Sequence, residues 1–328
     1  MTALPAPRTP DPMAAPPLRW GVMGTGWIAE RFIGSLRRHT RQRVVAIARS
    51  PRFGVERVHG SYEALVADPG VDVVYAATPH PLHLACARLA LAAGKPVLVE
   101  KPLGLSAEEA AEIAALAAAR GLFCMEALWT LFLPRFDVVR QLLETGALGE
   151  VRSVLADTGE SFAPDHRILR ADLAGGPLLD LGTYPVALAT WVLGEPAQVL
   201  AAGQPHPAGV NGQLAAILSD GDGNQAVVHT TLLGDTPTAA TIAGTEATLT
   251  LPGPFYMPGD VVVGEHRYEE PAVAHDALHF EAAEVARCIA DGRLESPLRP
   301  LADSITTLRA MDEIRSQCGI EWASTLPR

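Results

Sequence analysis

The 328-residue chain contains only two lysines, and one of them lies where reactive side chains are often found. Lys101 belongs to Glu100-Lys101-Pro102, which directly follows the apolar run Pro96-Val97-Leu98-Val99. In an open α/β sheet, a charged pair at the end of a buried strand lies at the carboxyl edge, where such sheets carry their chemistry. A solvated loop lysine is the alternative, but the other basic residues are almost all arginines, so lysine is not this chain's usual surface charge.

A second unusual segment runs from Gly175 to Pro185 and combines a Gly-Gly pair and two prolines with Asp180 and Tyr184. If one helix spans this segment, Asp180 and Tyr184 are four residues apart and share a face. Stability alone does not explain such a string in an amphipathic helix. Asp180 has two possible roles. Its side chain could orient Lys101 or a substrate, or it could cap a helix.

A glycine-rich segment near the start of the chain indicates a dinucleotide site. Gly24-Thr25-Gly26-Trp27-Ile28-Ala29 matches G-x-G-x-x-A and lies between a predicted strand and a predicted helix. The first glycine permits a tight turn, the second lets the backbone approach a pyrophosphate, and the helix N-terminus supplies N–H donors. A glycine turn without a ligand is the alternative. The predicted cofactor contacts are Gly24, Thr25, Gly26, Trp27 and Ile28.

The end of the second predicted strand favours NADP(H) over NAD(H). The segment Ala48-Arg49-Ser50-Pro51-Arg52 carries two guanidinium groups and a hydroxyl, and the next acidic residue is Glu56. These groups suit a 2′-phosphate, whereas an NAD site places a carboxylate here to accept from the ribose hydroxyl. We therefore predict that Arg49, Ser50 and Arg52 contact the cofactor. If they are ordinary surface residues, both cofactors bind.

Composition excludes several classes of function. The net charge of −11 and pI near 5.4 argue against a nucleic-acid partner or an anionic membrane surface. No apolar stretch is long enough to cross a bilayer, and the proline-rich residues 1–17 resemble neither a signal peptide nor an anchor. The four cysteines show no CxxC spacing, which is typical of a reducing, cytoplasmic location. We expect no metal site, because no His, Cys, Asp and Glu spacing is convincing.

The pattern of apolar residues divides the chain into an arm and two domains. Residues 1–17 are expected to form a disordered or extended arm, and residues 18–125 a doubly wound parallel sheet covered on both faces, since apolar strands alternate with helices. Strands are predicted at 18–23, 43–48, 71–77, 96–99 and 122–125. Helices are predicted at 28–39, 82–93 and 107–120, with Ser106 as N-cap and Gly121 after the end of the last. A short helical segment and residues 62–67 complete this half.

Residues 126–328 are predicted to form a second, α+β domain with a mostly antiparallel sheet, because Gly and Asp turns separate successive apolar segments. Its strands are expected at 151–157, 197–203, 213–218, 225–232, 239–243, 247–251 and 261–263. Its helices are expected at 134–144, 178–193, 277–291 and 301–317.

With these motifs in order along the chain, the sequence resembles the Gfo/Idh/MocA oxidoreductase family. It is most similar to the branch that contains dimeric dihydrodiol dehydrogenase and the NADP-dependent D-xylose dehydrogenases. The resemblance covers nearly everything after residue 17. It is carried by Gly24 and Gly26, Thr78-Pro79 with His83, Glu100-Lys101-Pro102, Met125-Glu126-Ala127-Leu128-Trp129-Thr130, Asp180 with Tyr184, Gly244-Thr245, Leu251-Pro252-Gly253-Pro254-Phe255 and Leu294-Glu295-Ser296-Pro297.

The resemblance implies a Rossmann domain followed by a domain with a large open sheet that often forms a homodimer. It also implies reversible hydride transfer between NADP(H) and a carbinol or carbonyl carbon of a sugar or cyclic diol. By the family pattern, Lys101 contacts substrate and nicotinamide ribose, and Tyr184 is the general acid/base. The further residues implied on the cofactor side are Thr78, Pro79, His83 and Glu100, and those implied near the substrate are Trp129, His166 and Asp180.

These implied roles agree with elementary acid–base chemistry. Removing a proton from an alcohol while its hydride leaves requires a base beside the hydroxyl oxygen. A free phenol titrates near pH 10, so Tyr184 needs help from a cation, and the ammonium group of Lys101 could supply it.

The chain also departs from the pattern of its branch. Leu131 stands where relatives usually carry Arg, and Pro177 replaces a usual small residue. If that Arg helps to shape the pocket, Leu131 leaves a less polar site, and the substrate is expected to differ from those of the named branch. His166 could reach the substrate or be a surface or structural residue, and His80 stays undecided. Trp129 could stack near the pocket or pack in the core.

Two other functions compete with a sugar or diol dehydrogenase. A keto-reductase of nucleotide-linked deoxysugars would keep the mechanism, but it needs positive charge for a second diphosphate, and the C-terminal half shows no obvious arginine cluster. A non-catalytic NADP-binding sensor is the other alternative. The presence of both Lys101 and Tyr184 argues against it.

Overall fold

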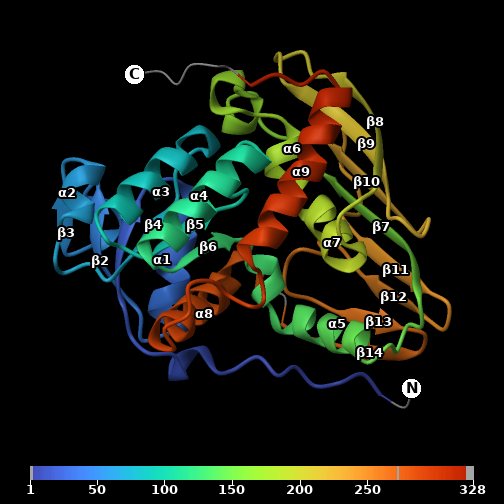
Figure 1. Ribbon diagram of the computed structural model, residues 1–328, viewed down its shortest axis with the longest axis horizontal. Helices are drawn as coiled ribbons and strands as arrows, with labels where there is room; N and C mark the ends of the chain where they lie inside the picture. Colours follow the sequence, from blue (N-terminus) through green and yellow to red (C-terminus); the bar gives the residue numbers. More distant parts are fainter. Residues whose placement is uncertain (1–2, 272, 323–328) are drawn as a thin grey trace.

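The computed structural model describes residues 3–271 and 273–322 and contains two sheets that lie side by side with helices between them (Figure 1). The first sheet is formed by the N-terminal part of the chain and the second by the C-terminal part. The predicted α/β fold, a Rossmann unit followed by a largely antiparallel sheet, is confirmed.

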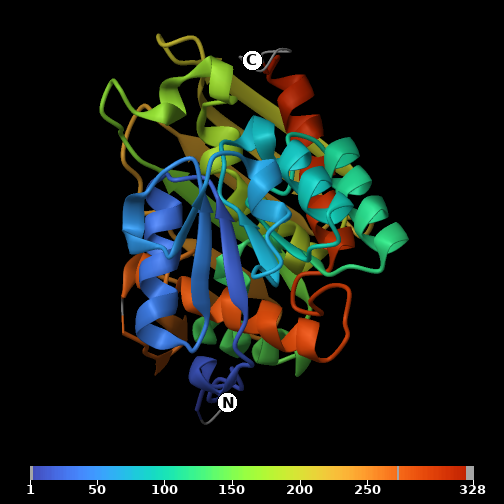
Figure 2. The same cartoon turned by 90° about the vertical axis from the view of Figure 1, so that its left-hand side faces the viewer.

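The first sheet is parallel and six-stranded, in the order β3-β2-β1-β4-β5-β6. Every residue of β4, β5 and β6 is buried, as expected of strands covered on both faces. Helix α1 lies on one side of this sheet and α3 and α4 lie on the other (Figure 2). The strands are β1 (Arg19–Met23), β2 (Arg43–Ala48), β3 (Arg57–His59), β4 (Val73–Ala76), β5 (Val97–Glu100) and β6 (Cys124–Ala127).

The helices of this half begin and end close to the predicted positions. They are α1 (Trp27–His39), α2 (Tyr62–Val66), α3 (His83–Ala92) and α4 (Ala107–Arg120). The hydroxyl of Ser106 accepts from the backbone N–H of Glu109, and Gly121 ends α4 with a φ of 62°, so both predicted caps of α4 are confirmed. The edge strand β3 was not predicted, since its three residues are too few to show a period.

The second sheet has eight strands in the order β14-β13-β12-β11-β7-β10-β9-β8. Only β7 and β10 pair in parallel, so the prediction of a mostly antiparallel sheet is confirmed. The sequence did not predict β14. The strands are β7 (Val151–Gly159), β8 (Gln198–Pro205), β9 (Asn211–Ser219), β10 (Gln225–Thr231), β11 (Ala240–Gly244), β12 (Thr248–Leu251), β13 (Val261–Val263) and β14 (His266–Tyr268).

Helices cover the face of this sheet that points toward the Rossmann unit, and its other face is open (Figure 1). Helix α7 packs against β7 and β10, while α9 packs against both α7 and α4 and so joins the two halves. The helices are α5 (Pro134–Glu144), α6 (Pro177–Asp180), α7 (Thr183–Leu193), α8 (His279–Ala290) and α9 (Leu301–Gln317). Among the described residues, no helix has the length and apolarity to cross a membrane.

The predicted single helix over 178–193 is wrong, because the chain breaks it at Leu181 and Gly182. The backbone N–H groups of both residues donate to the carbonyl of Pro177, which ends α6. Pro185 has no N–H to donate to the carbonyl of Leu181, so a continuous helix could not be completed here. Asp180 and Tyr184 therefore lie on either side of a corner.

The N-terminal residues 3–17 run in extended conformation with one 3-10 turn, η1 (Pro12–Ala14). The Arg8 guanidinium pairs with Asp137 on α5 at 2.9 Å, and Arg287 on α8 donates to the carbonyl of Pro10 at 3.1 Å. This segment thus lies along the outer side of α5 and α8.

Candidate active site

Lys101 and Tyr184 meet where the two halves of the chain face each other. Lys101 follows the last residue of β5, and Tyr184 lies in the first turn of α7. The ammonium nitrogen of Lys101 lies 4.9 Å from the centroid of the Tyr184 ring and donates to the backbone carbonyl of Asp180 at 2.6 Å. The structure therefore brings together the two side chains that the sequence singled out.

The phenol of Tyr184 is almost fully buried in an aromatic corner. The indole N–H of Trp129 donates to the phenol oxygen at 3.3 Å. The ring of Tyr256 stacks on the Tyr184 ring with centroids 4.2 Å apart. Trp129 belongs to the 3-10 turn η4 (Trp129–Phe132), which follows β6. Trp129 is thus both buried and in contact with the candidate acid/base.

The carboxylate of Asp180 pairs with the guanidinium of Arg167. The two Asp180 oxygens accept from the guanidinium at 2.6 and 3.3 Å, and the His80 Nε2 lies 3.6 Å from the carboxylate. Burial opposes ionisation of Asp180, but His80, Arg167 and Lys101 prevail and lower its pKa to about 2. Asp180 is the last residue of α6 and orients Lys101 through its backbone rather than its side chain.

Burial shifts the pKa of both candidate catalytic groups. It lowers the pKa of Lys101, an effect that Asp180 and Glu100 partly offset. It raises the pKa of Tyr184 well above its ordinary value, while the hydrogen bond from Trp129 acts in the opposite direction. The ammonium group of Lys101 lies over the Tyr184 ring, and burial dominates the pKa of the phenol in this geometry. Tyr184 accordingly carries its proton at neutral pH.

Glu100 holds the strand end that carries Lys101. The Tyr75 hydroxyl donates to one Glu100 oxygen, and the backbone N–H of Lys101 donates to the other at 3.1 Å. Just beyond, the backbone N–H of Leu103 donates to the buried carboxylate of Glu126 at 3.0 Å. These bonds fix the turn after β5, and Glu100 thereby holds the backbone of Lys101 in place.

The glycine-rich loop has the shape of a phosphate-binding turn. Gly24 has a φ of 108°, and a Cβ there would lie 2.1 Å from the carbonyl oxygen of Ala77, so only glycine fits. Gly26 is the N-cap of α1, whose free N–H groups face the loop. Thr25 and Ile28 are half-buried, and Trp27 is exposed. These residues fit a pyrophosphate.

The basic residues after β2 lie together at the carboxyl end of that strand. Arg49 has a φ of 66°, an unusual value for arginine, and its guanidinium lies 4.4 Å from the ring centroid of Tyr62. The Ser50 hydroxyl accepts from the backbone N–H of Arg52 at 3.3 Å. The guanidinium groups of Arg49 and Arg52 lie over the aromatic rings of Tyr62 and Phe53, respectively.

His83 braces the loops after β4 and β5. Its Nδ1 lies 2.7 Å from the carbonyl oxygen of Pro102 and its Nε2 lies 3.0 Å from that of Thr78. Between Thr78 and His83, Pro79 is the N-cap of the 3-10 turn η3 (His80–Leu82). His80 is buried beside Asp180, and burial lowers its pKa to about 3. Both histidines are therefore neutral, buried groups.

His166 and its neighbour Arg167 contact different partners. The His166 ring stacks on Phe162 at 4.5 Å, and its Nδ1 accepts from the backbone N–H of Ile168 at 3.3 Å. Arg167 instead reaches Asp180. The sequence did not indicate three further residues of this region, Arg167, Tyr256 and His275. Tyr256 stacks on Tyr184, and His275 stacks on Trp129. Their residue types are ordinary and carry no sign of a partner that is distant in the sequence.

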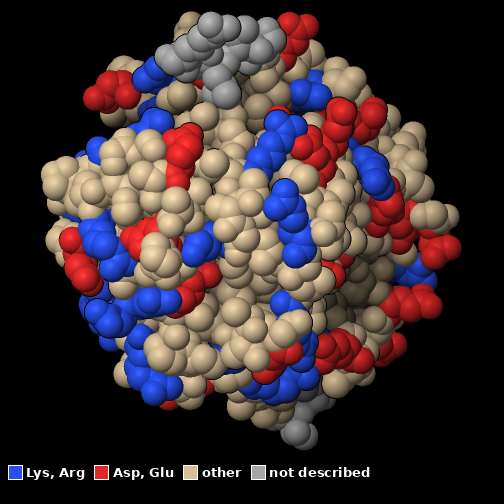
Figure 3. Space-filling model, turned by 60° about the vertical axis from the view of Figure 1, so that its left-hand side comes forward, with Lys and Arg blue, Asp and Glu red and all other residues tan. Residues whose placement is uncertain are grey.

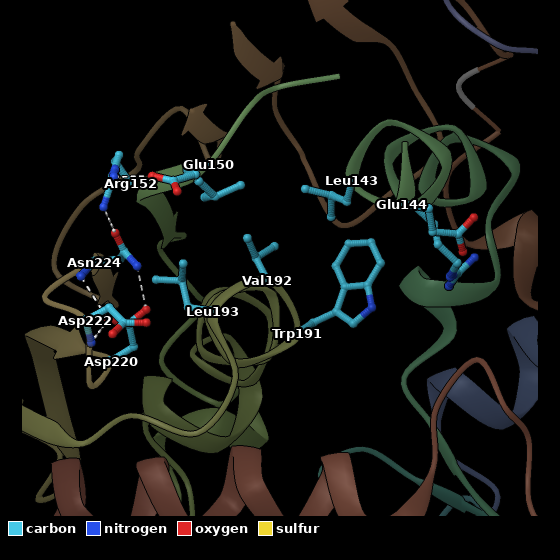
Figure 4. Close-up of a pocket in the computed structure, with 12 residues that line it drawn as sticks. Leu143, Glu144, Glu150, Arg152, Trp191, Val192, Leu193, Asp220, Asp222 and Asn224 are labelled. Atoms are coloured by element: carbon cyan, nitrogen blue, oxygen red, sulfur yellow. Dashed lines mark hydrogen bonds and ion pairs between the residues drawn. The ribbon is translucent and has the colours of Figure 1, made fainter. Parts of the chain in front are cut away.

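A separate cavity of about 760 Å³ lies at the far end of α7 (Figure 4). Arg152 donates to Asn224 and pairs with Glu150 on its rim, and Trp191 and Leu193 line it from the last turn of α7. Tyr184 lies at the opposite end of that helix, so this cavity is not part of the candidate active site.

The described residues 3–271 and 273–322 contain no cluster of three or more His, Cys, Asp or Glu side chains that could hold a metal ion. Acidic and basic residues are interspersed on the face shown in Figure 3. The site is built from Lys101, the phenols of Tyr184 and Tyr256, the indole of Trp129 and the ion pair between Asp180 and Arg167.

Comparison with known proteins decides the family. Residues 18–128 match the model of the oxidoreductase family with an NAD-binding Rossmann fold, and residues 136–250 match the GFO/IDH/MocA C-terminal domain. The chain belongs to the Gfo/Idh/MocA oxidoreductase family. Membership makes it an oxidoreductase that acts on CH–OH groups with a nicotinamide cofactor, and the predicted resemblance is confirmed.

Among curated Gfo/Idh/MocA proteins, the trans-1,2-dihydrobenzene-1,2-diol dehydrogenase of Bos taurus is 36% identical over 326 residues, covering 92% of this chain and 97% of the relative. The enzyme of that name from Homo sapiens is 35% identical with the same coverage. The predicted similarity to the dihydrodiol dehydrogenase branch is therefore confirmed.

Among solved structures, KijD10, a 3-ketoreductase from Actinomadura kijaniata in complex with NADP and TDP-benzene, matches with a TM-score of 0.80 and 29% identity. It covers 92% of this chain and 98% of its own. Levoglucosan dehydrogenase, in complex with NADH and levoglucosan, has a TM-score of 0.82, 20% identity and 93% and 98% coverage, which shows the shared fold alone.

Proposed function

We propose that this protein is an NADP-dependent dehydrogenase or reductase of a small sugar or cyclic diol, with Tyr184 as general acid/base and Lys101 as its partner. The observation that carries this proposal is the meeting of Lys101, Tyr184 and the Trp129 N–H in one buried corner. Similarity to dihydrodiol dehydrogenases over most of the chain supports the substrate class.

The protonated state of Tyr184 suits reduction of a carbonyl. When bound, the nicotinamide supplies a hydride to the carbonyl carbon, and Tyr184 gives its proton to the oxygen, which becomes a hydroxyl. In the opposite direction deprotonated Tyr184 would take the hydroxyl proton, and the oxidised cofactor would accept the hydride from the same carbon. Lys101 stabilises negative charge on either oxygen, and Trp129 donates to the phenol oxygen throughout.

NADP(H) is the proposed cofactor because Arg49 and Arg52 lie at the end of β2. Guanidinium groups bind phosphate with charge-assisted hydrogen bonds, and the Ser50 hydroxyl adds a donor. The glycine turn and the α1 N-terminus fit the pyrophosphate of either nicotinamide cofactor. The residues after β2 are therefore the ones that would choose between the two cofactors.

A nucleotide-linked keto sugar is the second candidate substrate, favoured by similarity to the reductase that was solved with TDP-benzene. A diphosphate needs unpaired cationic groups near the pocket. Arg167 is already paired with Asp180 and Arg170 with Asp172. We therefore favour a smaller, uncharged substrate, and a non-catalytic NADP sensor is the remaining alternative.

We further propose a homodimer formed by the open face of the eight-stranded sheet. Four exposed apolar side chains lie in one row across neighbouring strands, since Leu200 pairs with Ile217, Ile217 with Val227, and Val227 with Leu155. Their exposed fractions are 38–54%. A contiguous apolar row on an otherwise uncovered sheet is typical of a protein interface.

The experiment that tests the proposed function follows NADPH formation by absorbance. The purified protein is offered aldoses, inositols and a trans-dihydrodiol with NADP⁺ or NAD⁺. We expect turnover with NADP⁺ and at least one of these compounds. Tight NADPH binding without any turnover would favour the nucleotide-linked substrate or the sensor instead.

A further inference from the structure

A short segment of the C-terminal half returns to the Rossmann unit and is fastened there. The 3-10 turn η7 (Ala274–Leu278) packs against α1. The carboxylate of Asp276 accepts from Arg38 Nε at 3.0 Å and lies 3.0 Å from His39 Nε2. The Ser35 hydroxyl donates to the backbone carbonyl of Asp276. Three groups of α1 therefore fix the position of residue 276.

The residue before Asp276 is His275, whose ring contacts two indoles. Trp27 of the glycine-rich loop meets it edge-on, with centroids 4.6 Å apart and an angle of 78°. Trp129 stacks on it, with centroids 5.1 Å apart and an angle of 26°. His275 is thus the link between the cofactor loop and the indole beside Tyr184.

The contact on Trp129 matters because that indole makes a single directed bond to Tyr184. The donor–acceptor distance of 3.3 Å is at the long end of hydrogen bonding, so a small tilt of the indole would break it. The bond stabilises negative charge on the phenol oxygen and opposes the effect of burial. Whatever holds the plane of Trp129 therefore sets the strength of the candidate acid.

We propose that His275 is a positioning residue: its ring holds the Trp129 indole in the plane from which the N–H reaches Tyr184, and its contact with Trp27 joins that plane to the cofactor loop. The role of Trp129 in catalysis rests on the proposed function of Tyr184. The packing of His275 on Trp129 is independent of that function. His275 acts here through its ring face, without touching the reacting atoms.

The charge state of His275 agrees with this role. Burial, Lys101 and Arg31 lower its pKa to about 4, so the ring is neutral at neutral pH. An imidazolium would repel the ammonium of Lys101 across the site. A neutral planar ring can be replaced by another neutral planar ring, which makes a conservative substitution informative.

The test compares His275→Ala, which removes the ring, with His275→Phe, which keeps a flat neutral ring. In the direction of alcohol oxidation, we expect His275→Ala to lower kcat about tenfold. We also expect the pH at which activity rises to move upward by about one pH unit, since the phenol loses a donor. His275→Phe should retain kcat and the pH profile of the parent.

A second measurement does not depend on turnover. In ¹H–¹⁵N spectra, the indole N–H signal of Trp129 is assigned by its loss in Trp129→Phe. We expect this signal to shift and its hydrogen exchange to accelerate in His275→Ala, but not in His275→Phe. The exposed Trp27 signal should also respond to NADPH in the parent and respond less in His275→Ala.

The proposal is overturned if His275→Ala leaves the Trp129 signal and the pH profile unchanged. It is equally overturned if His275→Phe is as impaired as His275→Ala, because the ring nitrogens would then make a contact of their own. A parent protein without turnover would contradict the proposed function alone, since the Trp129 signal would still decide whether His275 holds the indole.

Discussion

The ammonium group of Lys101 is held by the backbone carbonyl of Asp180, 2.6 Å away, while the carboxylate of Asp180 faces Arg167. Asp180 therefore contacts Lys101 through its backbone and Arg167 through its side chain. The carboxylate joins the end of α6 to Arg167, and the carbonyl orients the lysine at the corner between α6 and α7. This arrangement makes the side chain and the backbone of Asp180 separable by mutation.

Asp180→Asn should reduce activity less than Lys101→Ala. The backbone carbonyl that orients Lys101 is retained, and the negative charge that faces Arg167 and His80 is lost. We expect kcat to fall by about tenfold or less, against about 10²- to 10⁴-fold for Lys101→Ala. Asp172→Asn, which breaks the exposed pair with Arg170, is the control. An Asp180→Asn protein as inactive as Lys101→Ala would show that the carboxylate itself takes part.

Arg49→Asp should reverse the cofactor preference. The new carboxylate repels a 2′-phosphate and can accept from a ribose hydroxyl, so kcat/KM with NADP⁺ relative to NAD⁺ should fall about 10- to 100-fold. Arg43→Asp is the matched control, since Arg43 begins β2, at the opposite end from Arg49, and is 69% exposed at its side chain. An unchanged ratio in Arg49→Asp would refute the proposed role of this segment.

The Asp180 carboxylate should stabilise the fold in a pH-dependent way. Its folded pKa of about 2 lies below the ordinary 3.8, so its contribution is full above pH 3.8 and is lost as the pH falls through 2. The difference in free energy of unfolding between the parent and Asp180→Asn should be about 1 kcal/mol smaller at pH 3 than at pH 6. Urea unfolding at the two pH values measures it, and an equal difference at both would contradict the assignment.

Val227→Lys should convert the proposed dimer to a monomer. A charge in the middle of the apolar row Leu200, Ile217, Val227 and Leu155 would be buried without a partner in the interface. Val58→Lys is the control, because Val58 is 47% exposed on the edge strand β3 of the other sheet. Light scattering after size exclusion gives the mass. A dimer that survives Val227→Lys would place the interface elsewhere.

The sequence was informative where a residue type was unusual for its place. Lys101 at the end of an apolar run, the string around Tyr184 and the Gly24 turn each pointed to a local requirement that the fold then explains. The parallel and antiparallel halves were also predictable, because strand burial on two faces and on one face leaves different apolar patterns.

Partners distant in the chain were not predictable from residue types. Arg167 is one of many arginines, and only the fold brings it to Asp180. His275 lies far from Trp27 and Trp129 in the sequence, and nothing in its local pattern names them. The break before Tyr184 is a different case. Pro185 was a signal for it, because it falls inside the predicted helix 178–193, where a proline ends or kinks a helix.

The most direct test of the central claim compares the parent with Tyr184→Phe. The variant keeps the buried ring and its stack on Tyr256 but has no phenol proton to move. We predict that NADP⁺ reduction with an accepted sugar or diol falls at least about 100-fold while NADPH affinity stays unchanged. Near-normal turnover in Tyr184→Phe would contradict Tyr184 as the general acid/base.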